Sequence, residues 1–139
     1  MKRILQLLLA FSLIISGAAA PVLAGATDPL YVNMTTSDSH RANMAISFSK
    51  NQFERGHPLT IFLNDKGVLV GSKANAAAFP EHQKMLAELM SKGAVVLICP
   101  MCMKQYGVKE ADILPGVKVS SPELTGNALF QDNTKTLTW

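Results

Sequence analysis

Residues 94–102 read AVVLICPMC and contain both cysteines of this 139-residue chain. The first five are apolar without alternation, which is typical of a strand buried on both faces in a parallel sheet. Cys99 then falls at the carboxyl end of that strand. Cys102 falls in the first turn of a helix that begins near Pro100 and ends before Gly107. Open α/β sheets bind ligands beyond the carboxyl ends of their strands, so this pattern indicates two thiols at the mouth of a site.

Strands and helices alternate on both sides of this stretch. Besides 94–98, extended segments are predicted over 29–36, 59–63, 117–120 and 135–139. Helices are predicted over about 39–55, 80–92 and 122–130. This alternation is typical of an α/β domain with a mainly parallel sheet and right-handed crossovers. No repeat or long linker divides the segment, so we predict a single domain.

The first 24 residues have a different character. Lys2 and Arg3 precede an apolar run and a small-residue stretch that ends at Ala24, the three-part pattern of a secretory signal peptide. The apolar run is shorter than the roughly 20 residues that span a bilayer, so no stable membrane anchor is expected. We predict cleavage near Ala24, a periplasmic or secreted location, and a domain over 25–139.

Loss of this leader changes the charge of the chain. The formal net charge falls from +3 to +1, because two of 13 basic side chains leave and all 10 acidic ones stay. No cluster of Lys and Arg remains to follow a phosphate backbone, so nucleic acid is not an expected partner. The sequence also has no glycine-rich phosphate loop, and no cofactor is predicted.

Several kinds of chemistry are open to a Cys-x-x-Cys pair in an exported protein. An oxidising compartment allows a disulfide, although so short a loop constrains the unfolded chain little. A thiol-disulfide oxidoreductase uses one thiol to attack and the other to resolve. Cys99, Cys102, Met101 and Met103 also form a set of soft sulfur ligands suited to Cu(I). Zinc is disfavoured, because no second cysteine pair completes four ligands.

The order of elements and the segment CPMCMKQYG, 99–107, resemble the DsrE/DsrF-like family. The segments ILPGVKVS, 113–120, and LTW, 137–139, agree with that resemblance. It implies an open, mainly parallel, flavodoxin-like five-stranded sheet with helices on both faces, assembly into trimers or hexamers, and persulfides passed between partners. By resemblance the sulfur-bearing residue is Cys99, eight positions before Gly107, and Cys102 is a second cysteine that assists release.

A flavodoxin-like strand order would place the loop after the first strand beside the loop after the third. That adjacency would bring Thr36, Ser37 and His40 toward Cys99 as substrate-binding residues. Lys104, in the helix after the cysteines, would attract an anionic sulfur species. An exposed first-turn histidine and a solvated lysine are the ordinary alternatives for His40 and Lys104.

The sequence therefore predicts a periplasmic sulfur-carrier protein rather than a turnover enzyme. Its expected partners are sulfur donor and acceptor proteins or small persulfides, together with further copies of the chain. A Cu(I)-binding protein and a thiol-disulfide oxidoreductase remain the alternatives.

Overall fold

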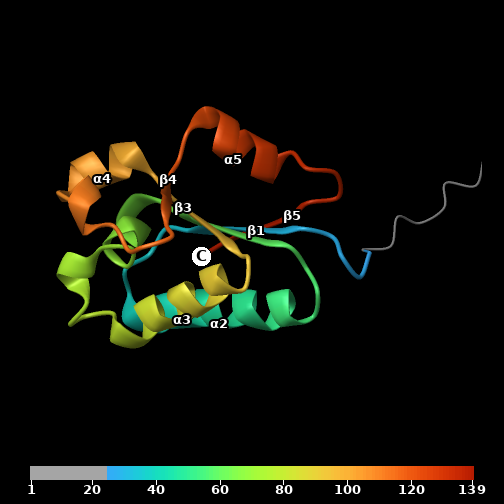
Figure 1. Ribbon diagram of the computed structural model, residues 1–139, viewed down its shortest axis with the longest axis horizontal. Helices are drawn as coiled ribbons and strands as arrows, with labels where there is room; N and C mark the ends of the chain where they lie inside the picture. Colours follow the sequence, from blue (N-terminus) through green and yellow to red (C-terminus); the bar gives the residue numbers. More distant parts are fainter. Residues whose placement is uncertain (1–24) are drawn as a thin grey trace, which may run out of the picture.

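The fold is a five-stranded, all-parallel sheet in the order β4-β3-β2-β1-β5, as seen in a computed structural model that describes residues 25–139 (Figure 1). The strands are β1 Leu30–Met34, β2 Leu59–Leu63, β3 Val95–Ile98, β4 Lys118–Val119 and β5 Lys135–Thr138. The prediction of an α/β domain with a parallel five-stranded sheet is confirmed. The leader predicted over 1–24 lies outside the described residues.

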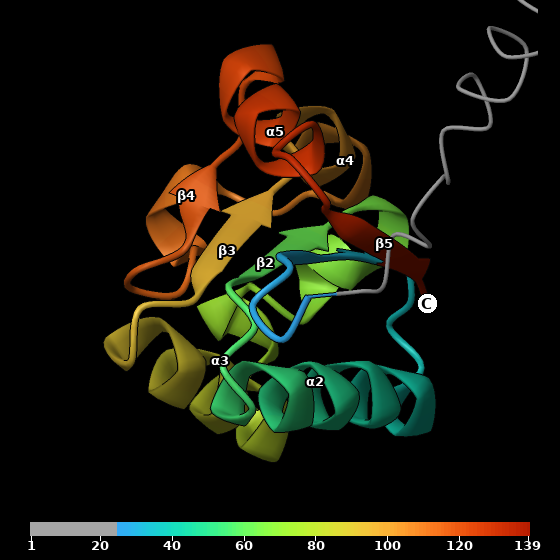
Figure 2. The same cartoon turned by 90° about the vertical axis from the view of Figure 1, so that its right-hand side faces the viewer.

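Within residues 25–139, four α-helices accompany the sheet, and both faces of the sheet carry helices. They are α2 Ser39–Glu54, α3 Pro80–Ser91, α4 Pro100–Tyr106 and α5 Pro122–Leu129. Figure 2 shows α2 and α3 on one face and α5 on the other. The short helix α4 lies beyond the carboxyl ends of the strands, against the 3-10 helix Asp65–Leu69 (Figure 1). Within the described part of the chain, every helix is too short or too polar to span a bilayer.

The helix ends follow local sequence chemistry. The side chain of Asp38 accepts a hydrogen bond from the Arg41 N–H and so caps α2. Pro80 and Pro100 each stand in the first turn of a helix, where a missing N–H costs nothing. Gly107 ends α4 with a φ of 69°, a backbone conformation that glycine adopts without strain.

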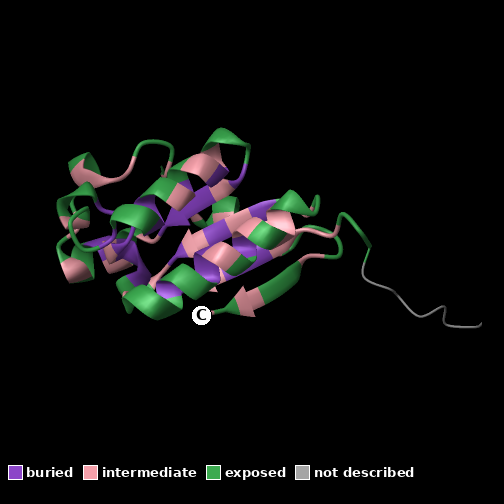
Figure 3. Cartoon of the chain, turned by 90° about the horizontal axis from the view of Figure 1, so that it is seen from below, coloured by how far each residue is buried: buried purple, intermediate pink, exposed green. Residues whose placement is uncertain are grey.

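The main core lies between the sheet and the pair α2 and α3 (Figure 3). Residues of β1 alternate between the two faces of the sheet, so Val32 and Met34 enter this core while Tyr31 faces α5. Fully buried side chains of the core include Met34, Ile46, Ile61, Leu63, Leu86, Leu89 and Ile98. Apolar burial of this kind is the dominant stabilising contribution in such a domain.

The strand order differs from the flavodoxin-like order that the sequence reading assumed. β2 lies between β1 and β3, and β1 pairs with β2 and β5, so the expected adjacency of the loops after the first and third strands is wrong. The residues after β1 instead meet β2 and the end of β5. Asn64 N–H donates to the Met34 carbonyl at 2.9 Å, and Thr35 N–H donates to the Trp139 carbonyl at 2.8 Å. The observed order arises because β2, β3 and β4 are added one after another on the same side of β1, and β5 is added on the other side. Local sequence patterns do not specify on which side of the sheet each new strand is added.

Candidate functional site

Cys99 lies where β3 ends and α4 begins, as the sequence predicts. Its backbone N–H donates to the Leu63 carbonyl at 3.0 Å and thereby continues the pairing of β3 with β2. Its Sγ accepts the Cys102 N–H at 3.2 Å, so the thiol serves as the N-cap of α4. Both cysteines are free thiols and both are partly buried. An N–H donor at this sulfur stabilises negative charge on it.

The Cys102 thiol is held by the loop that follows β2. Its Sγ lies 3.0 Å from Asn64 Oδ1, to which the thiol donates, and it accepts the Asp65 N–H at 3.2 Å. Burial and, second to it, the hydrogen bond with the neighbouring Cys99 thiol together raise the pKa of Cys102 to about 11, against the opposing effect of the Asp65 N–H. Cys102 therefore remains protonated at neutral pH.

A second contact ties α4 to the same loop. The Tyr106 hydroxyl donates a hydrogen bond to Asp65 Oδ1, and this bond raises the pKa of the phenol. Asp65 itself has a φ of 45°, in the left-handed region. Two residues on, a Cβ added to Gly67 would lie 2.1 Å from the Met34 carbonyl oxygen. The loop is thus closely packed against the end of β1, and it fixes the surroundings of the second thiol.

Sequence reasoning underrated these loop residues. Asn64 and Asp65 follow the second apolar strand as ordinary turn-forming residues, whereas the structure places both against the Cys102 thiol. The available signal was their position directly after the second apolar strand. The carboxyl ends of neighbouring parallel strands meet at one edge of the sheet, so polar residues there adjoin the end of the third strand.

The predicted substrate-binding residues lie in the loop after β1, in the first turn of α2 and on α4. Thr36 Oγ1 accepts the Asp38 N–H at 3.0 Å, and His40 is exposed in the first turn of α2. Within the described residues, no hydrogen bond joins Thr36, Ser37 or His40 to either cysteine. Lys104 is exposed on α4. A binding role for these four residues stays a prediction, but the strand adjacency that motivated three of them is absent.

The two methionines of the possible copper site lie in contrasting surroundings. Met103 is 6% exposed and packs in the hydrophobic core, whereas Met101 is 82% exposed. Over residues 25–139, His, Cys, Asp and Glu side chains form no group of three or more able to hold a metal ion. A soft-ligand set would therefore consist of the two thiols, with Met101 as the thioether that is free to move toward them.

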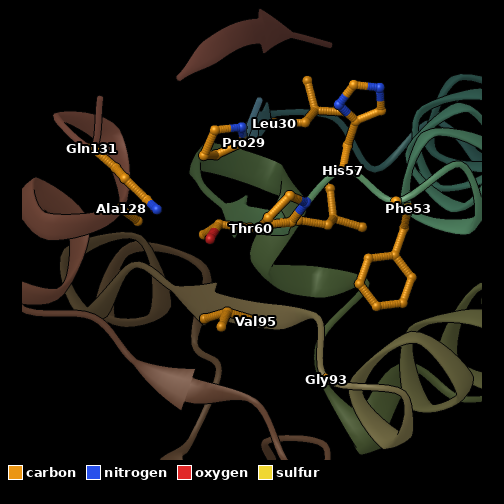
Figure 4. Close-up of a pocket in the computed structure, with 12 residues that line it drawn as sticks. Pro29, Leu30, Phe53, His57, Thr60, Gly93, Val95, Ala128 and Gln131 are labelled. Carbon is orange, nitrogen blue, oxygen red and sulfur yellow. The ribbon is translucent and has the colours of Figure 1, made fainter. Parts of the chain in front are cut away.

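A cavity of about 400 Å³ lies at the opposite edge of the sheet, among the amino ends of β1, β2 and β3. Figure 4 shows Phe53, His57 and Thr60 around it. The His57 Nδ1 atom is 2.8 Å from the Asp28 carbonyl oxygen, and this contact orients the ring. Neither cysteine lines this cavity, so the thiol chemistry is confined to the carboxyl edge of the sheet.

Fold and site together define a small α/β protein with two neighbouring thiols at the carboxyl edge of a parallel sheet. Residues 30–136 match the DsrE/DsrF-like family. The chain belongs to this family, which is associated with sulfur relay.

Two uncharacterized proteins are similar to the chain in sequence. MJ0989 of Methanocaldococcus jannaschii is 34% identical over 82 residues, which cover 58% of this chain and 72% of that protein. MK0008 of Methanopyrus kandleri is 32% identical over 82 residues, which cover 58% of this chain and 68% of that protein. Neither name assigns an activity.

Solved structures confirm the fold. The protein of unknown function MTH1491 from Methanobacterium thermoautotrophicum superposes with a TM-score of 0.67 at 17% identity, covering 81% of this chain and 99% of that one. The protein of unknown function BT1422 from Bacteroides thetaiotaomicron superposes with a TM-score of 0.59 at 19% identity, and the match covers 81% of this chain and 95% of that one. At these identities the likeness concerns the fold alone.

Proposed function

We propose that the protein is an exported sulfur carrier that holds sulfane sulfur as a persulfide on Cys99, with Cys102 assisting release. One observation carries the proposal: the Cys99 sulfur accepts the Cys102 N–H at 3.2 Å, with the second thiol in the adjoining turn. Membership of a family associated with sulfur relay supports the same reading.

The chemistry requires two exchanges at sulfur. In loading, the Cys99 thiolate attacks the outer sulfur of a donor persulfide, the donor S–S bond breaks, and the donor departs as a thiol after taking up a proton. In transfer, an acceptor thiolate attacks the outer sulfur of the Cys99 persulfide and regenerates Cys99. Alternatively, Cys102 attacks the inner sulfur, releases hydrosulfide and leaves a 99–102 disulfide that a thiol reductant reopens.

The two thiols are suited to different steps. Cys102 is protonated at neutral pH, because its pKa is about 11, and it donates its proton to Asn64. A protonated thiol is a poor nucleophile, so Cys102 does not compete for the donor. The low nucleophilicity of Cys102 supports loading at Cys99, and release through Cys102 requires that the Cys102 thiol first lose its proton.

Location and partners follow from the leader and the family. The signal-peptide pattern over 1–24 supports a periplasmic or secreted carrier. Its partners would be sulfur donor and acceptor proteins or small persulfides. Members of the family are typically oligomeric, which supports assembly of this chain into trimers or hexamers.

Intact-protein mass spectrometry after treatment of the reduced protein with a persulfide donor tests the proposal. We expect one added sulfur atom in the wild type and in Cys102→Ser, and none in Cys99→Ser. Equal loading of both variants contradicts the assigned roles. Loss of two hydrogens without added sulfur indicates an oxidoreductase, whose disulfide should have a potential between about −120 and −270 mV. Tight Cu(I) binding that depends on Met101 supports the copper alternative instead.

A further inference from the structure

A cleft of about 390 Å³ opens beside Cys99, on the face of the sheet that α5 covers. We propose that this cleft receives the uncharged, apolar organic group of a small persulfide, so that the substrate class of the carrier is a persulfide R–S–SH in which R is neutral. This inference rests on the proposed function, since it specifies the donor that loads Cys99.

The walls of the cleft come from three parts of the fold. Tyr31 and Phe62 supply the floor from neighbouring strands, with ring centroids 6.4 Å apart. Leu129 and Thr125 supply the opposite wall from α5, which spans this face of the sheet (Figure 2). Met101, 82% exposed, stands at the rim. Cavities of about 300–1,000 Å³ with apolar and aromatic walls are typical of small-molecule sites.

None of the described residues that line the cleft carries a charged side chain. Two of its hydroxyl groups, those of Ser121 and Thr125, already make hydrogen bonds in the first turn of α5. Thr125 Oγ1 donates to the Ser121 carbonyl at 2.8 Å, and Ser121 Oγ accepts the Leu124 N–H at 3.1 Å. Burial also raises the pKa of Tyr31, which keeps its phenol neutral. A carboxylate or ammonium on R would lose its hydration here without gaining an ionic partner, and that loss is unfavourable.

The geometry of the exchange explains why R occupies this space. The Cys99 sulfur attacks the outer sulfur of R–S–SH along the line of the S–S bond, so the departing R–S group points away from Cys99. A new bond forms between Cys99 Sγ and the outer sulfur as the donor S–S bond breaks. The donor departs as R–SH after taking up a proton, so no external oxidant or reductant is needed. The cleft has Cys99 on its wall and holds the departing group.

A matched pair of donors tests the charge selectivity. The probes are benzyl persulfide and its para-carboxylate analogue, which differ in one remote charge and expel closely similar thiols. Loading of Cys99 is followed by intact mass in the Cys102→Ser variant. We expect the neutral probe to load about tenfold faster or more, because the cleft offers no partner for the carboxylate. Equal rates overturn the proposal.

A charge introduced into the wall should shift this preference. Thr125→Lys places an ammonium in the cleft and should favour the carboxylate probe by about tenfold relative to the parent. Asn127→Lys is the matched control, since it adds the same charge on α5 at an exposed position that does not line the cleft. If both variants shift the ratio equally, the effect comes from the general field of the protein and the cleft has no role.

Two further readouts separate the possible failures. Benzyl bromide and its para-carboxylate analogue should alkylate Cys99 with the same preference for the neutral probe. If this preference is found while neither persulfide adds sulfur to Cys99, the sulfur-carrier function fails and the apolar cleft stands. If persulfides load without selectivity, the cleft proposal fails and the carrier function stands. If Thr125→Lys lowers the native mass of the assembly and leaves the probe ratio unchanged, a second copy covers the cleft and the proposal is overturned.

Discussion

The pKa of the Cys102 thiol should lie well above that of a free cysteine, and removal of the Cys99 thiol should lower the pKa of Cys102. Its pKa is about 11 against a usual 9.0, with burial as the largest cause and the Cys99 thiol as the next. The substitution Cys99→Ala removes the second cause and leaves most of the first. We therefore expect the pKa of Cys102 in this variant to fall below 11 and to remain above 9.0.

The size of the effect follows from two opposing factors. At pH 8 a thiol with a pKa near 11 is about one part in a thousand thiolate, against about one in eleven at a pKa of 9, a ratio of roughly a hundred. The more basic thiolate is intrinsically more reactive, by roughly tenfold at a Brønsted slope of about 0.5. In the wild type, Cys102 should therefore be alkylated roughly tenfold more slowly than an unperturbed thiol. In Cys99→Ala the alkylation rate of Cys102 should lie between these two rates.

Pulsed alkylation with iodoacetamide between pH 7 and pH 11, read by peptide mass spectrometry, measures this difference. The alkylation rate at Cys102 should rise steadily with pH over this range and reach about half of its maximum only near pH 11. Circular dichroism at each pH confirms that the protein stays folded, and Cys102→Ala isolates the reaction of Cys99. A plateau at or below pH 9, or a higher midpoint in Cys99→Ala, would refute the electrostatic account.

Three further predictions concern stability and are measured by urea denaturation. Gly67→Ala should lower the free energy of unfolding by about 1–3 kcal/mol, since the new Cβ meets a backbone carbonyl. Gly126→Ala, with open space around it in α5, should instead raise it by about 0.5–1 kcal/mol, and equal effects would contradict the packing argument. Met103→Ala should cost about 2–5 kcal/mol, whereas exposed Met101→Ala should change stability little; a large effect at Met101 would disprove the burial difference. Gln83→Ala should cost about 1–3 kcal/mol for each of the two buried carbonyls that its amide satisfies, and a neutral outcome would mean that water replaces the amide.

Much of the fold could be predicted from local patterns. The run 94–98 contains the largely buried strand Val95–Ile98, Pro80 begins α3 and Gly93 follows the end of α3, as composition and spacing indicate. These features depend on residues close in sequence, where propensity and periodicity act directly. The edge strand was predicted less accurately. An extended segment was expected over 117–120, but β4 comprises only Lys118–Val119, because strand formation at a sheet edge depends on pairing with a neighbouring strand and not on propensity alone.

The candidate site was predicted only in part, for a related reason. The position of Cys99 follows from the strand that precedes it, so sequence alone places it at the carboxyl edge. Which loops surround it depends on strand order, which is a property of the whole sheet. The assumed order favoured Thr36 and His40, whereas the actual order brings Asn64 and Asp65 to the Cys102 thiol. Likewise, Met103 resembled a soft ligand in the sequence and proved to be a core residue.

The pairing of β5 with β1 has a consequence for the order of folding. This pairing joins Leu30 to Lys135 across almost the whole described domain, and closing so long a loop is slow relative to the shorter crossovers that build β1, β2 and β3. The contacts of Cys102 with the loop after β2 span fewer than forty residues and do not involve β5. We therefore expect the thiol pair to assemble early. The cleft wall supplied by α5 would close over it in a later step, so the reactive sulfur would be most accessible while the chain is still folding.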